Sequence, residues 1–267
     1  MFTIFISIIK DRKKALLIYC LTGIVFLWLF IAFFPLMQEQ TASVVELMEG
    51  MPEGFLKAFG VEEESFTTVE GFLAAKQYSA TWPLMVILLL VAIAGTTIAG
   101  EIEKGSIEIT LARPISRIKI FIGRYLAGSA MLAIFTIFSI YSVLPLGAIY
   151  DVDLQLSSIV KLSIIAFLFG LAVLSLSMFM SALLSEKSRV YMIVGALMMS
   201  MYIMNTVALI KVELENIRYA SFFNYLDTNG ALILNEMSAL SIWVFICSAI
   251  VFAGIGAYIF NRRDITT

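Results

Sequence analysis

The sequence predicts an all-α integral membrane protein whose helices cross the bilayer six times. Hydrophobic residues make up 61% of its 267 residues and charged residues only 14%, whereas about 25% of the residues in a soluble domain are charged. Six apolar segments are long enough to cross the hydrocarbon core as helices, which takes about 20 residues each. None shows the alternation of period two that is typical of strands in a membrane β-barrel. We therefore expect one transmembrane domain over residues 1–267.

The six predicted spans are separated by loops of very unequal length. The longest loop on one side of the membrane is 100–124, and the long loops on the other side are 38–77 and 211–237. The predicted spans are residues 15–37, 78–99, 125–150, 162–184, 190–210 and 240–260.

The first residues, 1–9, are apolar and precede a charged cluster. A secretory signal peptide has the opposite order, with its positive charges before the apolar run. We interpret the segment as an interfacial helix on the cytoplasmic face, whose basic end is held by anionic lipid headgroups. A frayed terminus is the alternative. The cluster consists of Lys10, Asp11, Arg12, Lys13 and Lys14.

Lysine and arginine are distributed very unequally between the two sides. With the N-terminus inside, 13 of the 18 basic residues lie on the cytoplasmic side. Because basic loops stay in the cytoplasm, the sequence predicts a multi-pass protein of the cell membrane with both termini cytoplasmic. The thirteen are Lys10, Arg12, Lys13, Lys14, Lys104, Arg113, Arg117, Lys119, Arg124, Lys187, Arg189, Arg262 and Arg263, and the other five are Lys57, Lys76, Lys161, Lys211 and Arg218.

The residue types that most catalytic and metal sites need are scarce. The chain has no histidine, which excludes histidine ligands and histidine-based catalysis. Its two cysteines, Cys20 and Cys247, lie in apolar segments, so we expect packed thiols and neither a disulfide nor a zinc site. Asp151 and Asp153 are the nearest candidates for an intramembrane enzyme, but no third group accompanies them. We therefore expect this chain to be no enzyme and to hold no cofactor or metal.

The outer loop 38–77 contains an amphipathic pattern. Pro52 is expected to divide it into two short helices, because proline suits the start of a helix and not its middle. We interpret the acidic run Glu62–Glu64 as a solvated loop, with a cation site as the alternative. The apolar residues recur at spacings of three and four, which is typical of one helix face: Val44, Met48, Met51, Phe55 and Phe59.

Loop 211–237 is too aromatic for a free loop. We expect short amphipathic or re-entrant helices at the outer interface, with tyrosine and phenylalanine at the depth of the lipid headgroups. The sequence Asp-Thr-Asn-Gly from Asp227 is a turn signal. The alternative is an outer gate for a substrate, formed by Phe222, Phe223 and Tyr225.

The middle of each predicted span contains no charged residue. A charge there costs about 2.5–3.5 kcal/mol and is usually retained where an ion or a proton passes. Its absence therefore argues against a proton-coupled transporter and against a charged pore. Ser177, Ser181 and Ser185 recur every four residues, a pattern that allows helices to approach closely. We expect helix packing, and a polar translocation surface is the alternative for Ser175, Ser177, Ser181, Tyr202 and Asn205.

The charged loop 100–124 predicts a helical elbow that stands off the membrane. We expect a first helix over residues 101–111. Lys104 lies three residues after Glu101 and four before Glu108, so it is expected to pair with both carboxylates. The helix should end before Pro114, because the residue before a proline disfavours helical angles.

Ser116 is expected to cap a second helix. Arg113, Arg117 and Arg124 follow one another at spacings of four and seven. A plain positive anchor beside the membrane explains these arginines, and it remains open as an interpretation. It gives no role to the acidic residues of the same loop.

The segment AGEIEKGSIEITLARPISRIKIFIGRYL resembles a motif of the ABC type-2 permease family, the membrane subunits of ATP-driven exporters. The family pattern is an acid-rich stretch, Gly-Thr-Leu-Glu, then Pro-x-Ser-Arg, and an apolar stretch with Gly-Lys. Ser106 stands where threonine is usual, and Arg124 where lysine is usual. The six spans and cytoplasmic termini also agree, so the resemblance covers essentially the whole chain. The matching residues are Glu101, Glu103, Gly105, Glu108, Pro114, Ser116, Arg117 and Gly123.

The resemblance implies that the loop 100–124 is a cytoplasmic coupling helix seated in an ABC ATP-binding subunit. It also implies a second membrane subunit, in a homodimer or a heterodimer, around one substrate path. The expected coupling contacts are Glu101, Glu103, Lys104, Gly105, Glu108, Pro114, Ser116 and Arg117.

ATP hydrolysis is expected only in the separate subunit, because this chain has no G-x-x-x-x-G-K-[ST] loop. Membrane lipid is a further expected partner, and nucleic acid is not. The alternative function is a channel or a scaffold that works without ATP.

Overall fold

The computed structural model of the chain describes residues 2–39, 68–112, 114–150, 152 and 154–264. These residues form helices and no strand, and six of the helices are long and apolar enough to cross a membrane. This confirms the predicted fold class. The amphipathic pattern and the acidic run predicted between residues 44 and 64 lie outside the described residues.

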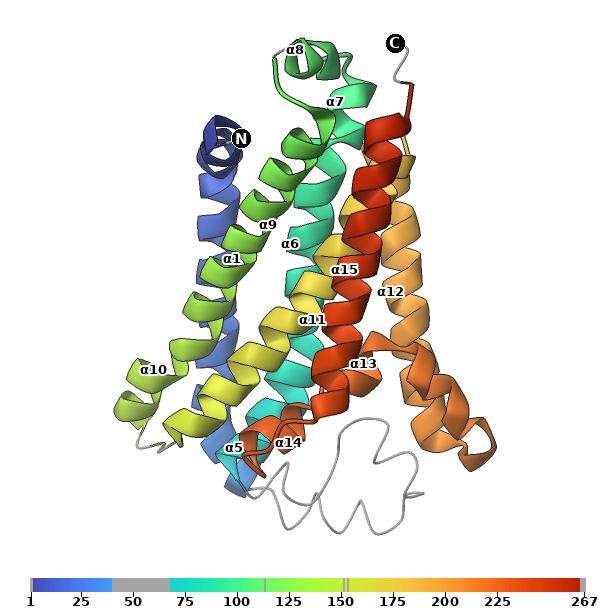
Figure 1. The fold of residues 1–267 in the computed structure, drawn as a ribbon. Helices are drawn as coiled ribbons and strands as arrows, with labels where there is room; N and C mark the ends of the chain where they lie inside the picture. The colour runs from blue at the N-terminus through green and yellow to red at the C-terminus, as the bar shows by residue number, and fades with distance from the viewer. Residues whose placement is uncertain (1, 40–67, 113, 151, 153, 265–267) are drawn as a thin grey trace.

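The long helices stand side by side in one bundle (Figure 1). In chain order the elements are α1 (Phe2–Glu39), α5 (Val69–Phe72), a π-helix (Leu73–Thr81), α6 (Trp82–Thr97), α7 (Ala99–Glu103), α8 (Ile107–Leu111), α9 (Arg117–Tyr141), α10 (Val143–Tyr150), α11 (Leu156–Leu183), α12 (Lys187–Ile210), a 3₁₀ helix (Val212–Ala220), α13 (Phe222–Tyr225), α14 (Thr228–Leu232) and α15 (Ala239–Arg262).

The helix α11 is the centre of the bundle, where it packs against α6, α9 and α15. Between membrane helices there is little hydrophobic driving force, so close packing of small residues holds them together. Gly170 shows this, because a Cβ there would lie 2.5 Å from Cδ1 of Leu132 on α9. In return, a Cβ at Gly128 on α9 would meet Leu174 of α11 at 2.9 Å. The two helices therefore interlock through reciprocal glycine–leucine contacts.

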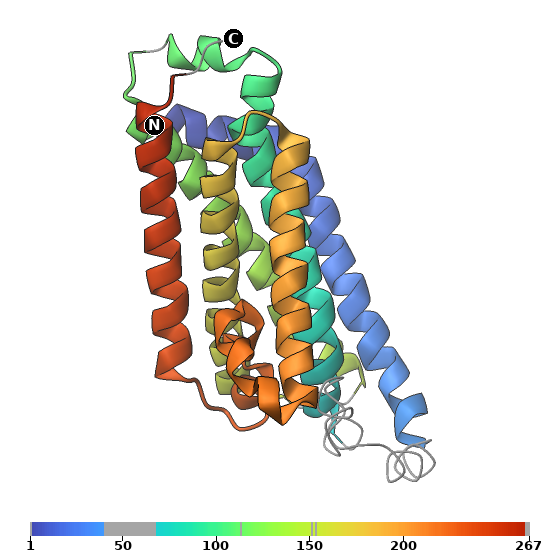
Figure 2. The ribbon, with the colours of Figure 1, turned by 90° about the vertical axis from the view of Figure 1, so that its right-hand side faces the viewer.

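The first span differs from its prediction in being one continuous helix. Its first turns run across one end of the bundle, and the rest of α1 then follows the length of the bundle (Figure 2). Near that bend the Ser7 hydroxyl donates to the carboxylate of Asp11 at 3.4 Å. The segment predicted as a separate interfacial helix is therefore continuous with the first span.

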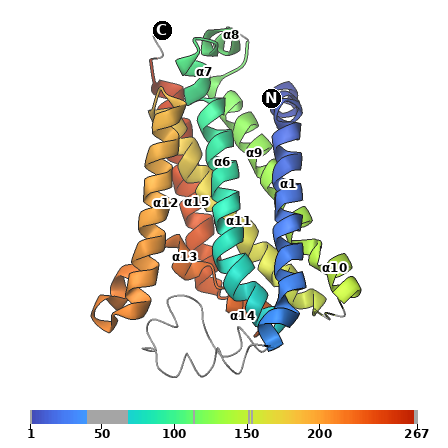
Figure 3. The same ribbon diagram turned by 180° about the vertical axis from the view of Figure 1, so that it is seen from behind.

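The helix of the second span begins earlier than its predicted start at residue 78. Thr68 caps it, accepting a hydrogen bond from the backbone N–H of Gly71 at 3.1 Å. From Val69 the chain is helical through α5, the π-helix and α6. Viewed from behind, α6 lies between α1 and α12 (Figure 3). The second span is therefore one continuous helical rod from Val69 to Thr97.

The segment after α12 turns back into the bundle. The helices α13 and α14 lie between the ends of α12 and α15 (Figure 2). The ring of Phe222 is 6.1 Å from that of Phe245, and the ring of Phe223 is 5.5 Å from that of Phe169. The segment therefore forms short helices, and the rings of Phe222 and Phe223, expected at the depth of the lipid headgroups, pack on the core of the bundle.

Candidate functional site

The charged segment from Ala99 to Arg124, here called the elbow, stands off one end of the bundle. It comprises α7, α8 and the start of α9, and it lies at the same end as the start of α1 and the end of α15 (Figure 1). The single helix predicted over residues 101–111 is wrong, because the chain turns between α7 and α8. Gly105 has a φ of +69° there, a left-handed conformation that glycine adopts without steric cost. The elbow therefore has two short helices before α9.

The predicted pairing of Lys104 with two glutamates is also wrong. Lys104 is exposed and forms no ion pair with any residue that the structure describes. The physical reason is the turn at Gly105, which interrupts the helical spacing that would place the three side chains on one face.

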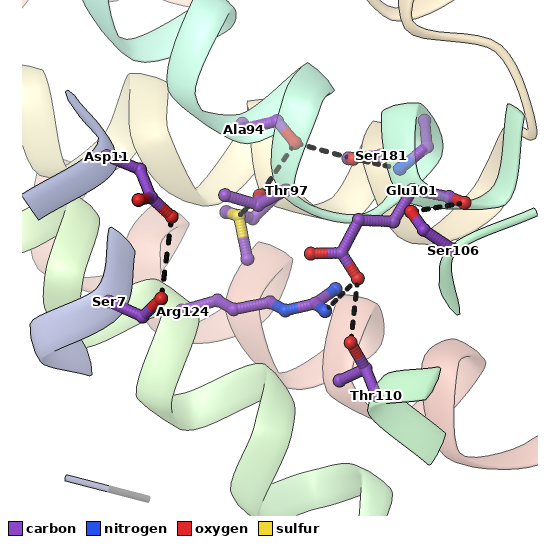
Figure 4. A network of polar contacts seen from close by, with 11 residues as sticks. Ser7, Asp11, Ala94, Thr97, Glu101, Ser106, Thr110, Arg124 and Ser181 are labelled. Atoms are coloured by element: carbon purple, nitrogen blue, oxygen red, sulfur yellow. Dashed lines mark hydrogen bonds and ion pairs between the residues drawn. The ribbon is translucent and has the colours of Figure 1, made fainter. Parts of the chain in front are cut away.

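Glu101 pairs instead with Arg124, across the elbow. A guanidinium nitrogen of Arg124 donates to Oε2 of Glu101 at 2.6 Å, and the Arg124 side chain is only 1% exposed. The hydroxyl of Thr110 donates to the same carboxylate oxygen at 3.1 Å. Figure 4 shows the three side chains converging from α7, α8 and α9. This ion pair, buried on the side of Arg124 and partly exposed on the side of Glu101, fixes the three helices to one another. Sequence reasoning missed it.

Glu103 connects the elbow to α12. Its carboxylate accepts a hydrogen bond from the backbone N–H of Lys187 at 3.0 Å, and Lys187 is the first residue of α12. The first N–H groups of a helix have no partner within the helix, and a negative charge there is favourable because of the helix dipole. Glu103 therefore caps a helix that follows it by more than eighty residues.

Ser181 of α11 bridges the break between α6 and α7. It accepts from the backbone N–H of Ala99 at 3.0 Å and donates to the carbonyl of Ala94 at 2.6 Å (Figure 4). Ser177 donates to the carbonyl of Val173 in its own helix at 2.7 Å. Both serines are fully buried, so they pack helices and do not line a polar path.

Arg117 joins the elbow to the last span. Its guanidinium donates to the carbonyl oxygen of Arg263, just after α15. The guanidinium of Arg263 in turn donates to the carbonyls of Ala182 at 2.8 Å and Leu184 at 2.9 Å, and to the hydroxyl of Ser185 at 2.5 Å. Burial lowers the pKa of Arg263, but an arginine still keeps its charge at neutral pH. The start of α9 and the ends of α11 and α15 are thus tied together.

Ser116 and Pro114 are placed as the sequence indicates. Ser116 is the N-cap of α9 and accepts from the backbone N–H of Lys119 at 3.5 Å. Pro114 follows the end of α8 and is exposed.

The outward face of the elbow carries an apolar side chain that sequence reasoning missed. Ile109 on α8 is 70% exposed, whereas Ile107 on the same helix is fully buried. Glu108 beside it is exposed, as are Lys104 and Gly105. The sequence spacing could have indicated this exposure, because side chains two residues apart on a helix point to nearly opposite faces. Ile109 is thus a single exposed apolar side chain next to charged residues on α8.

The predicted outer gate lies at the opposite end of the bundle from the elbow. Phe223 and Tyr225 line a cleft of 630 Å³ between α12, α15 and the π-helix. Phe222 is not part of its lining, because its ring packs in the core against Phe245. The structure therefore brings two of the three aromatic residues to one surface.

Within the described residues, no group of three or more acidic or cysteine side chains is arranged to hold a metal ion. Cys20 and Cys247 are both free thiols, of which Cys20 is buried. Asp151 and Asp153, the weak enzyme candidates, lie outside the described residues.

The chain was compared with protein families and with curated proteins. A family model with the description ABC-2 family transporter protein matches residues 5–265. A search among curated proteins finds no significant match.

Proposed function

This chain belongs to the ABC-2 family of transporter proteins, as a multi-pass membrane permease subunit, and we propose that it couples ATP hydrolysis by a separate subunit to export. The family match supports an ABC ATP-binding partner and dimeric membrane subunits in general. As a transport subunit it is not itself the catalytic component. ATP hydrolysis in the partner must therefore move this membrane subunit through specific contact residues.

The observation that carries the proposal is the division of the elbow into an outward and an inward face. Outward, α8 presents Ile109 and Glu108. Inward, Glu101, Glu103 and Arg117 bond to α9, to α12 and to the chain after α15. A plain positive anchor needs neither the exposed isoleucine nor these specific bonds.

We assign different roles to the two faces. The partner docks on the outward face, where Ile109 enters its groove and Lys104, Glu108 and Pro114 surround the contact. The inward bonds transmit the resulting movement, because coupling between distant sites travels through packed side chains, ion pairs and rigid helices. Glu101, Glu103 and Arg117, expected from the family motif to touch the partner, are in this proposal transmitting residues. Gly105 supplies the turn and Ser116 the cap.

We place a second membrane subunit beside α12 and α15, whose faces are the most exposed among the described spans. Only 17% of the most apolar stretch of each of these helices is buried, the lowest share among the six. Such faces are covered by lipid or by another membrane helix. We place the protein in the cell membrane with the elbow in the cytoplasm, as the distribution of basic residues favours. The start of α1 and the end of α15 lie at the same end of the bundle and are then cytoplasmic too.

The test is to purify the tagged chain from its native membrane in a mild detergent. The ATP-binding subunit is identified by mass spectrometry, and ATP hydrolysis is measured in the complex. Ile109→Asp and Glu108→Lys should each weaken the association about 30-fold, the effect of losing an interface hot spot of about 2 kcal/mol. The thermal midpoint of the isolated chain should stay unchanged in Ile109→Asp, because Ile109 is 70% exposed.

The matched control is Glu186→Lys. Glu186 is a charged residue at the same end of the bundle, paired on the surface with Arg189 at 2.9 Å, and its reversal should leave the complex intact. Full ATP hydrolysis and full association in both elbow variants would refute the proposed docking face. Recovery of the wild-type chain without any ATP-binding subunit would refute the coupling itself.

A further inference from the structure

The cleft at the end opposite the elbow has the composition of a binding site. Its walls come from the π-helix, the end of α12, the helices α13 and α14, and the start of α15. Its volume of 630 Å³ falls in the range of about 300–1,000 Å³ that is usual for small-molecule sites. The walls combine aromatic rings with amide, hydroxyl and charged groups.

The π-helix is held in place by hydroxyl groups. In a π-helix each backbone hydrogen bond spans one residue more than in an α-helix. This form is rare overall, and where it occurs it is often at a functional site. The hydroxyl of Ser79 donates to the carbonyl of Ala74 at 2.6 Å, and that of Thr81 donates to the carbonyl of Lys76 at 3.0 Å. Thr228 of α14 shares a hydrogen bond with Ser79 at 2.7 Å. Two walls of the cleft are thus joined to each other.

Four polar side chains in the cleft have no side-chain partner among the residues that the structure describes. Lys76, Asn205, Thr206 and Asn224 line it, and none makes a side-chain hydrogen bond or ion pair in the part of the chain that the structure describes. Each is half-buried, so water solvates it only in part. An unpaired polar group in such a place costs free energy, and that cost is recovered when a ligand supplies the missing bonds.

The charged side chains in the cleft determine which charge a bound ligand should carry. Among the described residues that line it, Lys76 is the only basic one. Asp227 is the only acidic one among those same residues, and its carboxylate already accepts from the backbone N–H of Gly230 at 2.8 Å as the cap of α14. The available charge is therefore the ammonium of Lys76, which favours an anionic group.

The aromatic side chains indicate that the uncharged part of the ligand is apolar. The rings of Tyr202 and Phe223 lie edge to face at 5.3 Å, and Tyr225 completes the wall. The hydroxyl of Tyr225 donates to the carbonyl of Tyr219 at 3.0 Å, so its ring is held in a fixed position. This wall accepts an apolar body beside the polar group.

We propose that this cleft binds an amphipathic anion, with a phosphate or carboxylate at Lys76. Asn205, Thr206 and Asn224 hydrogen-bond the remaining atoms of the head, and the apolar part lies against Tyr202 and the other rings. As a station for exported molecules the site rests on the proposed function. The binding itself does not, because no elbow residue lines the cleft.

The test uses radiolabelled dodecyl phosphate and the purified full chain in maltoside micelles. Lys76→Gln should weaken binding about tenfold to 100-fold, the range expected for a lost charge-assisted hydrogen bond. Lys76→Arg keeps the charge and should stay within about threefold of wild type, which shows that the site is intact. Lys211→Gln, which removes an exposed lysine after α12 that does not line the cleft, should change nothing.

Two competitors separate head from tail. Dodecyltrimethylammonium has the same tail and the opposite charge, and inorganic phosphate has no tail. The inference requires that both compete at least tenfold more weakly than unlabelled dodecyl phosphate. Equal competition by the cation overturns the anionic preference, and equal competition by phosphate overturns the amphipathic one. Unchanged binding in Lys76→Gln overturns the whole assignment.

The elbow variant Glu108→Lys keeps the two proposals apart. It should bind dodecyl phosphate like the wild type while it loses ATP-driven coupling. Coupling without dodecyl phosphate binding would remove this inference alone, and binding without any ATP-binding subunit would remove the proposed function alone.

Discussion

The elbow and the outer cleft lie at the two ends of one helical rod, and they treat their polar groups in opposite ways. At the elbow, Glu101, Glu103 and Arg117 each bond to a neighbouring helix or to the chain beside it. At the cleft, Lys76 and Asn205 have no partner among the described residues. Internal bonds fix a geometry, whereas unpaired groups await a ligand. The elbow is therefore suited to transmit movement and the cleft to receive a molecule.

The largest effect on stability is expected when the negative charge that pairs with Arg124 is removed. Glu101→Ala leaves a guanidinium buried without its partner, in a side chain that is 1% exposed. Breaking a buried ion pair in this way costs about 3–5 kcal/mol. We expect a large fall in the thermal midpoint of the purified chain in detergent, together with a lower yield.

Two controls show whether burial is the cause. Arg124→Met added to Glu101→Ala should restore most of the midpoint, because no unpaired charge is left. Glu186→Ala disrupts the exposed pair with Arg189 and should cost less than about 1 kcal/mol. If Glu101→Ala is as harmless as Glu186→Ala, the elbow is not held by its buried pair.

A medium effect is expected at the cleft. Thr228→Val keeps the shape of a side chain that is 3% exposed but removes its bonds to Ser79 and to the carbonyl of Ala74. The loss should be about 1 kcal/mol, seen as a small fall in the midpoint. Binding of dodecyl phosphate should weaken by a few-fold, because the wall that carries Lys76 is no longer tied to α14. Loss of stability with unaltered binding would separate the scaffold from the site.

The smallest effect is expected at Lys104. It is exposed and has no ion-pair partner among the described residues, so Lys104→Gln should change the free energy of unfolding by less than about 0.5 kcal/mol. A helix with Lys104 between Glu101 and Glu108 would lose two ion pairs instead. A midpoint that falls as far as in Thr228→Val would restore that single-helix interpretation.

The fold was readable because it depends on long apolar runs. Hydropathy and length found all six membrane-crossing helices, and local rules found the cap at Ser116. The earlier start of the second helix was not readable. Lys76 and Gln77 look like loop residues in the sequence, and only the hydroxyls around the π-helix explain how a polar segment stays helical.

The interior of the elbow was not readable either, because its bonds join distant segments. Nothing local to Arg124 reveals that it meets a glutamate 23 residues earlier. The bond from Glu103 to Lys187 spans 84 residues. The turn at Gly105 decides which charges meet, and a lone glycine among charged residues gives only a weak signal. Local patterns therefore predicted which segment forms the charged elbow and not the bonds within it.

The bond from Arg117 to Arg263 also sets an order of assembly. Glu101 meets an arginine 23 residues away, whereas the acceptor of Arg117 follows it by 146 residues. At a synthesis rate of about 5–20 residues per second, that acceptor is made roughly 7–30 s after Arg117. The bond between Glu101 and Arg124 can form before α15 is made, and the bond from Arg117 closes only once α15 is in place. Chains that stop before Arg263 therefore lack the finished elbow, which distinguishes them structurally from chains that contain α15.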